Sequence, residues 1–201
     1  MKSKIPNDKD AILSEWRWIY ANFPKFNLIT DVKSPTVFQS TIGQRVDHFK
    51  KKNYIEKYTE TVKDEKYSIS LIDDSIICFY YIFDNDEKLV GHNLSYIPSP
   101  LSGDAPMGEE IAFSKYIRAD YDKTGYENVF HTLVHLHISI YKTEFRIPIA
   151  HFLSPWDFLY IILKYIYHSH EDIIDNLMIN KRRESLLSPE EMSRLRIIIG
   201  E

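Results

Sequence analysis

The segment 75–83, SIICFYYIF, has the strongest β-strand character in this chain. It is apolar at nearly every position, which predicts a strand that is buried on both faces near the middle of a sheet. Turn-forming residues flank it, Asp73 and Asp74 before it and DNDE at 84–87 after it. Because both connections are short, we expect its neighbours along the chain to pair with it in antiparallel fashion.

Other segments with strand character lie on both sides of this stretch. They are 37–42, 54–62, 66–72, 89–97, part of 111–121, 134–140 and 144–149. The first of them is short, and 54–62 alternates only loosely between apolar and polar residues. Residues 98–108 (PSPLSGDAPMG) read as a loop, because proline, glycine and serine dominate there. The pattern predicts an antiparallel meander of about six strands within residues 54–150.

Helical patterns occupy both ends of the sequence. Residues 8–23 carry an apolar stripe at helical spacing that ends before Pro24, and Asn7 or Asp8 can cap its start. Ser154 followed by Pro155 is typical of a helix start, and an apolar stripe follows it. Shorter helices are predicted at 44–51, at 171–179 and from 188 onward. The chain is therefore predicted to be one α+β domain, residues 1–201, with the helices of 8–23 and 154–201 packed on one face of the sheet.

Composition narrows the class of protein. Hydrophobic residues make up 44% and charged residues 27% of the 201 positions, which is ordinary for a folded globular chain. A formal net charge of −4 gives no strong basic field, so contact with nucleic acid would depend on local patches of Lys and Arg. The single cysteine, Cys78, leaves no partner for a disulfide within the chain and is expected to be an inert core thiol.

Several signals are missing from the sequence. The first residues lack the apolar run of a signal peptide, and no window approaches the roughly 20 apolar residues of a membrane helix. We therefore expect a bacterial cytoplasmic protein with no membrane contact. The sequence contains no P-loop, dinucleotide fingerprint, Cys/His zinc spacing or G-x-S-x-G elbow, so no cofactor is predicted.

One group of polar residues is predicted to share a face of the sheet. In 134–140, Val134 and the apolar residues that alternate with it face one way, against the helix that starts at Ser154. The residues between them point to the opposite face, and Phe145 shares the apolar side in the next strand. The polar face is expected to collect His135, His137, Arg118, Arg146 and Asp120, with His131 and Asp122 at its rim.

Three chemistries could use this set, beside an ordinary structural role. His135 and His137 could serve as general acid and base, with Arg118 or Arg146 stabilising a phosphoryl transition state. The same histidines, with His131 or Asp120, could ligate a transition metal, although H-x-H on a strand is a weak signal. The Arg and His groups could bind an anion without reaction. The alternative is solvent-facing histidines beside an ordinary cross-strand ion pair.

The motifs IRADYD at 117–122, HTLVHLHI at 131–138, FRIPI at 145–149 and LSPWDFLYIILKYIY at 153–167 resemble a bacterial family known only as a domain of unknown function, the 2290 family. The resemblance covers roughly residues 54–167. It implies no activity, because that family is uncharacterised. Thr132 stands where the family pattern leads us to expect proline, which puts the role of His131 in doubt.

The resemblance suggests a small protein encoded beside defence or toxin–antitoxin genes. We expect a non-enzymatic or accessory factor that binds an anionic ligand, nucleic acid or a neighbour-encoded protein partner on the His/Arg face. The alternative is a metal-independent ribonuclease that uses the same side chains.

Overall fold

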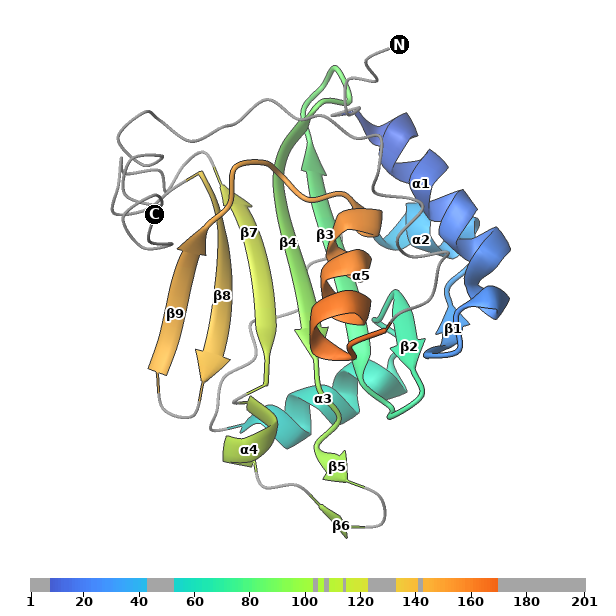
Figure 1. Cartoon of the computed structure of the whole chain (residues 1–201). Helices are drawn as coiled ribbons and strands as arrows, with labels where there is room; N and C mark the ends of the chain where they lie inside the picture. The colour runs from blue at the N-terminus through green and yellow to red at the C-terminus, as the bar shows by residue number, and fades with distance from the viewer. Residues whose placement is uncertain are drawn as a thin grey trace.

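A computed structural model describes residues 8–42, 53–102, 105–106, 109–113, 115–122, 133–140 and 143–169 of the chain (Figure 1). The helices and strands, in chain order, are α1 (Lys9–Asn22), the 3-10 turn η1 (Phe23–Lys25), β1 (Ile29–Val32), α2 (Pro35–Thr41), α3 (Tyr54–Lys63), β2 (Ile69–Leu71), β3 (Ile76–Phe83), β4 (Leu89–Ile97), β5 (Leu101–Ser102), β6 (Ala105–Pro106), α4 (Glu109–Phe113), β7 (Ile117–Asp122), β8 (Val134–Ile140), β9 (Thr143–Pro148), α5 (Pro155–Ile161) and the π-helical turn η3 (Ile162–Ile166).

Seven of the strands form one sheet in the order β1-β2-β3-β4-β7-β8-β9, and every neighbouring pair is antiparallel. The β3–β4 hairpin is the longest pairing, with Cys78 opposite Ser95 and Tyr80 opposite Asn93. The predicted α+β class and antiparallel sheet are confirmed, and the strand count of seven is slightly higher than predicted. β1, at one edge of the sheet, is a strand that the sequence did not predict, whereas β9 at the other edge corresponds to the predicted strand 144–149.

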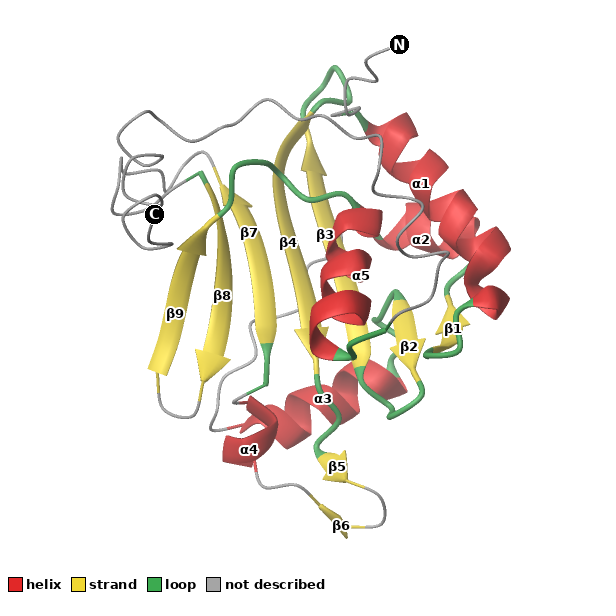
Figure 2. Cartoon of the chain, viewed as in Figure 1, coloured by secondary structure: helices red, strands yellow, loops and turns green. Residues whose placement is uncertain are grey.

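Helices α1 and α5 cover one face of this sheet, and Figure 2 shows α5 lying across β3 and β4. Trp18 of α1 meets Trp156 of α5 edge to face, with 5.4 Å between ring centroids. Trp16 is fully buried and stacks on Phe38 of α2 at 4.0 Å. Each such aromatic removes a large apolar area from water, so this layer carries most of the hydrophobic stabilisation.

The start of α5 follows from its own sequence. The Ser154 hydroxyl accepts a hydrogen bond from the Asp157 N–H, and the Asp157 carboxylate accepts one from the Ser154 N–H. This reciprocal capping box satisfies two backbone donors that a helix start would leave unpaired. Pro155 occupies the first helical position, where a missing N–H costs nothing. The predicted starting point of this helix is confirmed.

Helices α3 and α4 lie against the opposite face of the sheet, at one end (Figure 1). Their small core holds Tyr54 and Tyr58 of α3 with Cys78 of β3 and Tyr116 before β7. Cys78 is buried, as expected, and burial raises the pKa of its thiol to about 12. The polar side chains of β4, β7 and β8 occupy the part of that face that α3 and α4 do not cover.

Three sequence predictions were wrong. Residues 54–62 were predicted as a strand but form α3, whose buried Tyr54, Tyr58 and Thr61 recur at helical spacing. Residues 37–42 were also predicted as a strand, but Ser34 caps a helix there, α2, with Pro35 in its first turn. The strand predicted within 111–121 is confirmed as β7, which begins at Ile117 after the short helix α4. In the predicted loop 98–108, β5 and β6 form a two-stranded sheet of their own.

One apolar face was also assigned wrongly. Phe145 and Ile147 of β9 were expected to pack under α5, but they are 50% and 42% exposed. α5 lies over β3 and β4, so it does not reach the edge strand (Figure 1). The helices predicted at 44–51, at 171–179 and from 188 onward lie outside the described residues. Among the residues that are described, no helix has the length and apolar character required to cross a membrane.

Candidate functional site

Strands β7 and β8 bring four polar side chains together. Their register pairs Arg118 with His137 and Asp120 with His135. The residues that alternate with them, such as Ala119 and Val134, are fully buried in the core beneath α1 and α5. The four polar residues therefore point to the other face of the sheet, as the alternation predicts.

The Asp120 carboxylate is the centre of this cluster. Its Oδ2 accepts a hydrogen bond from Arg118 Nε at 2.8 Å and lies 3.1 Å from His137 Nε2, while Asn93 Nδ2 donates to Oδ1. Burial alone would raise the pKa of this carboxyl. The hydrogen bond from His137 and the charge of Arg118 outweigh that effect and hold the pKa of Asp120 well below its ordinary value. Asp120 is therefore a fixed negative charge beside the two imidazoles.

The two imidazoles are packed against each other and almost closed off from solvent. His135 and His137 are each 3% exposed, and their ring centroids lie 4.6 Å apart. His135 Nε2 lies 3.9 Å from Asp120 Oδ2. A carboxylate in contact with imidazole orients the ring and stabilises its protonated form, which is the arrangement used in acid–base sites.

The proton on His137 Nε2 has two competing neighbours. Arg118 Nη2 lies 3.0 Å from this nitrogen and can only donate, whereas Asp120 Oδ2 can only accept. If Nε2 is unprotonated it accepts from Arg118, and if it is protonated it donates to Asp120. Nε2 of His137 therefore has a hydrogen-bond partner in either tautomer of the imidazole.

The other predicted site residues stand apart from the centre. Arg146 of β9 is directly opposite His137 in the β8–β9 register and is exposed; within the described part of the chain it makes no hydrogen bond. Asp122 is exposed at the end of β7, on the same face as Asp120. His131 lies outside the described residues.

The sequence analysis missed two members of the network. Asn93 and Ser95 of β4 face the cluster, and the Ser95 hydroxyl lies 3.3 Å from both Asn93 Oδ1 and the Tyr116 hydroxyl. The alternation of HNLSY at 92–96 could have placed Asn93 and Ser95 on one face. What the sequence did not reveal is that β4 lies beside β7, because the long segment between the two strands hides their pairing.

A transition metal is the next chemistry to weigh at this site. Asp120, His135 and His137 each offer one ligand atom, and these atoms lie within 4.8 Å of one another. Two histidines and one carboxylate form a donor set that transition metals accept. However, the Arg118 guanidinium already contacts both Asp120 Oδ2 and His137 Nε2. A metal ion would have to displace that cation, so the geometry favours chemistry that uses Arg118.

Together, the fold and the site define an α+β protein with a seven-stranded antiparallel sheet, which carries a partly buried carboxylate–imidazole–guanidinium cluster on the face opposite α1 and α5. The sequence model of a family described as "Uncharacterized conserved protein (DUF2290)" matches residues 20–199. The chain belongs to that family, and the match extends beyond the range of the resemblance noted in the sequence. No curated protein and no solved structure matches the chain.

Proposed function

We propose that this protein binds an anionic group of a ligand, nucleic acid or partner protein on the sheet face that carries Arg118, His137 and Arg146. The observation that supports this is the register of three neighbouring strands, in which these residues lie in one row across β7, β8 and β9. The row spans two strand spacings, roughly 10 Å. A guanidinium group can bind phosphate or carboxylate oxygens in paired hydrogen bonds, and Arg146 is exposed at one end of the row.

The charges of the row favour an anion. Asp120 neutralises one cation, Arg118, with which it makes an ion pair at 2.8 Å. Arg146 is exposed and adds a positive charge that no described ion pair offsets. The row therefore carries more positive than negative charge.

The direct test is a binding titration with inorganic phosphate, a short single-stranded RNA and an acidic peptide as separate probes. Arg146→Gln removes an exposed cation of the row, and Arg17→Gln removes an exposed cation on α1 as the matched control. We expect the favoured probe to bind Arg146→Gln about tenfold more weakly, which corresponds to roughly 1.4 kcal/mol, and to bind Arg17→Gln as it binds wild type. Equal affinities for both variants and the wild type would disprove the proposal.

We place this binding role in an accessory factor of a bacterial, cytoplasmic defence or toxin–antitoxin system. This placement follows the expectation that the family resemblance suggested in the sequence analysis. A tagged copy expressed with its gene neighbours should retain a neighbour-encoded protein through purification. That partner should be lost from Arg146→Gln and kept by Arg17→Gln.

A second candidate is a metal-independent ribonuclease, favoured by the contact of Asp120 with His137. In that reaction one imidazole removes the proton from a ribose 2′-hydroxyl, and the resulting oxygen attacks phosphorus. The other imidazole protonates the departing 5′-oxygen, leaving a cyclic phosphate. Arg118 or Arg146 would stabilise the charge that develops on the phosphoryl oxygens.

Incubation with mixed RNA in EDTA separates the two candidates. Cleavage that is lost in His137→Ala and in Asp120→Asn, but kept in Arg17→Gln, would support the ribonuclease. Binding of RNA without any cleavage would support the accessory role. Metal analysis of the purified protein tests the metal-site alternative, since a metal site would require close to one ion per chain.

A further inference from the structure

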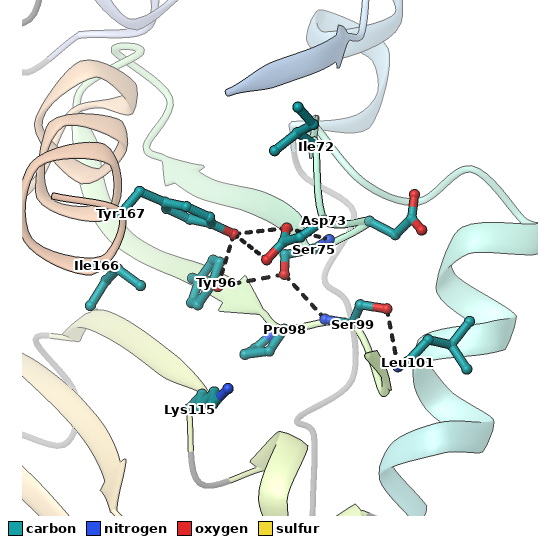
Figure 3. Close-up of a pocket in the computed structure, with 11 residues that line it drawn as sticks. Ile72, Asp73, Ser75, Tyr96, Pro98, Ser99, Leu101, Lys115, Ile166 and Tyr167 are labelled. Atoms are coloured by element: carbon teal, nitrogen blue, oxygen red, sulfur yellow. Dashed lines mark hydrogen bonds between the residues drawn. The ribbon is translucent and has the colours of Figure 1, made fainter. Parts of the chain in front are cut away.

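A separate cavity of about 580 Å³ opens on the other side of β4, away from the His/Arg face. The β2–β3 turn, the end of β4 and the η3 turn surround it, and Tyr96 and Tyr167 line it from two of these elements (Figure 3). Its volume falls within the range of small-molecule sites, about 300–1,000 Å³. The cavity shares no lining residue with the polar cluster, so it is an independent candidate site.

A hydrogen-bonded network fixes the polar wall of this cavity. The Tyr167 hydroxyl donates to the Asp73 carboxylate, at 2.8 Å from each oxygen, and lies 3.1 Å from the Tyr96 hydroxyl. The Tyr96 hydroxyl donates in turn to Ser75 Oγ, which also accepts the Ser99 N–H at 3.2 Å. Because these groups hold one another in position, a ligand would meet a wall whose geometry is already set.

The rim of the cavity is apolar. Ile72, Leu101 and Ile166 line it and are 61%, 52% and 39% exposed. Single exposed aliphatic residues are ordinary, but three around one opening provide contact area for an apolar group. A ligand with a polar end and a short apolar part would therefore bury both ends favourably.

The charges around the cavity are unfavourable to an anion. Asp73 and Asp74 line it against a single cation, Lys115, which leaves one net negative charge. Burial raises the pKa of both Tyr96 and Tyr167, so their hydroxyls stay neutral. Asp73 Oδ2 accepts only from Tyr167 among the described residues and retains capacity for another donor.

We propose that this cavity binds a small organic cation, namely a primary ammonium group on a short branched apolar chain. The ammonium donates to the Asp73 carboxylate in a charge-assisted hydrogen bond. It also lies close to the aromatic pair of Tyr96 and Tyr167, whose rings meet edge to face with centroids 6.1 Å apart. The apolar chain packs against Ile72 and Leu101 at the rim.

The experiment compares three probes with one carbon skeleton: 3-methylbutylammonium, 3-methylbutanol and 3-methylbutanoate. Ligand titrations followed by NMR give a dissociation constant for each. We expect the ammonium to bind about tenfold more tightly than the alcohol, from the charge-assisted hydrogen bond. The carboxylate should bind more weakly than the alcohol.

Variants identify the groups responsible. Asp73→Asn should weaken ammonium binding about tenfold and leave binding of the alcohol unchanged, because it removes the charge but keeps an acceptor oxygen. Lys115→Gln should tighten ammonium binding, since it removes a like charge. Asp86→Asn, an exposed carboxylate in the β3–β4 turn, is the matched control and should change nothing. Equal binding of ammonium and alcohol, or an Asp73→Asn variant that binds like wild type, would overturn the proposal.

Discussion

His92 should make the stability of this protein fall as the solution becomes mildly acidic. Its ring is 3% exposed and connects three parts of the fold. Nδ1 donates to the Ala119 carbonyl of β7 at 3.2 Å, and Nε2 accepts from the Leu153 N–H before α5 at 3.0 Å. Only a neutral imidazole can make both hydrogen bonds, because a protonated ring has no acceptor. Burial, opposed in part by the charge of Asp120, lowers the pKa of His92 from 6.5 to about 4.

The direction and size of the effect follow from this pKa. Between pH 6.5 and 4 the unfolded chain takes up a proton at His92 that the folded chain does not, so the unfolded state is favoured increasingly. The contribution is complete above pH 6.5 and is lost as the pH falls towards 4. The interval between the two pKa values corresponds to about 3 kcal/mol, at roughly 1.4 kcal/mol for each pKa unit.

The assay is urea unfolding followed by tryptophan fluorescence at several pH values from 8 to 4. His92→Gln removes the titration while its amide can still donate and accept. At pH 8 we expect this variant to be less stable than wild type by about 1–3 kcal/mol, from imperfect hydrogen bonds. At pH 4 the difference should have shifted by about 3 kcal/mol in favour of the variant, so that it falls to about zero or changes sign, because only wild type loses stability through this group.

A second core variant controls for general destabilisation. Ile77→Val, at a fully buried position of β3, should cost about 1 kcal/mol with no titratable group involved. Its difference from wild type should stay the same at every pH. If the His92→Gln difference is also constant from pH 8 to 4, the inference that His92 stays neutral in the folded protein is wrong.

Three further predictions concern other buried groups. Ser154→Ala removes the N-cap hydroxyl of α5 and should lower the free energy of unfolding by about 1 kcal/mol in urea titrations, an effect that Ser154→Thr should largely avoid. Asp120→Asn should lower the free energy of unfolding by about 1–3 kcal/mol at pH 7, because it leaves Arg118 and His137 without their charged partner. Since the pKa of Asp120 is depressed in the folded state, the difference from wild type should narrow as the pH falls below about 4, which is a lower range than that of His92. Cys78 should react with a thiol reagent only when the protein unfolds, since burial holds its pKa at about 12, and rapid labelling of the native protein would contradict its burial.

The sequence predicted correctly those helices and strands whose pattern depends only on residues a few positions apart. The apolar run of β3, the capped start of α5 and the helical stripe of α1 were each predicted close to their observed bounds. α3 was misread, because its buried face of Tyr54, Tyr58 and Thr61 is narrow and its other positions alternate by chance. A short amphipathic segment fits both periods, and packing against Tyr116 and Cys78 decides between them.

The candidate site was predicted in part for the same reason. Strand alternation alone placed His135 with His137, and Arg118 with Asp120, on common faces. Their meeting depended on the β7–β8 register, and the contribution of Asn93 depended on β4 being the next strand. The cavity at Tyr96 and Tyr167 was not foreseen, because it joins residues 71 positions apart.

The sequence by itself determined which residues alternate, where α1 and α5 begin and which side chains can carry charge or accept a proton, because these properties depend on neighbours a few positions away. Only the tertiary structure decided which strands are adjacent, which face α5 covers and which polar groups lose their water. Those outcomes depend on contacts between distant segments, and it is these contacts that lower the pKa of His92 and Asp120 and close the cavity beside Tyr167.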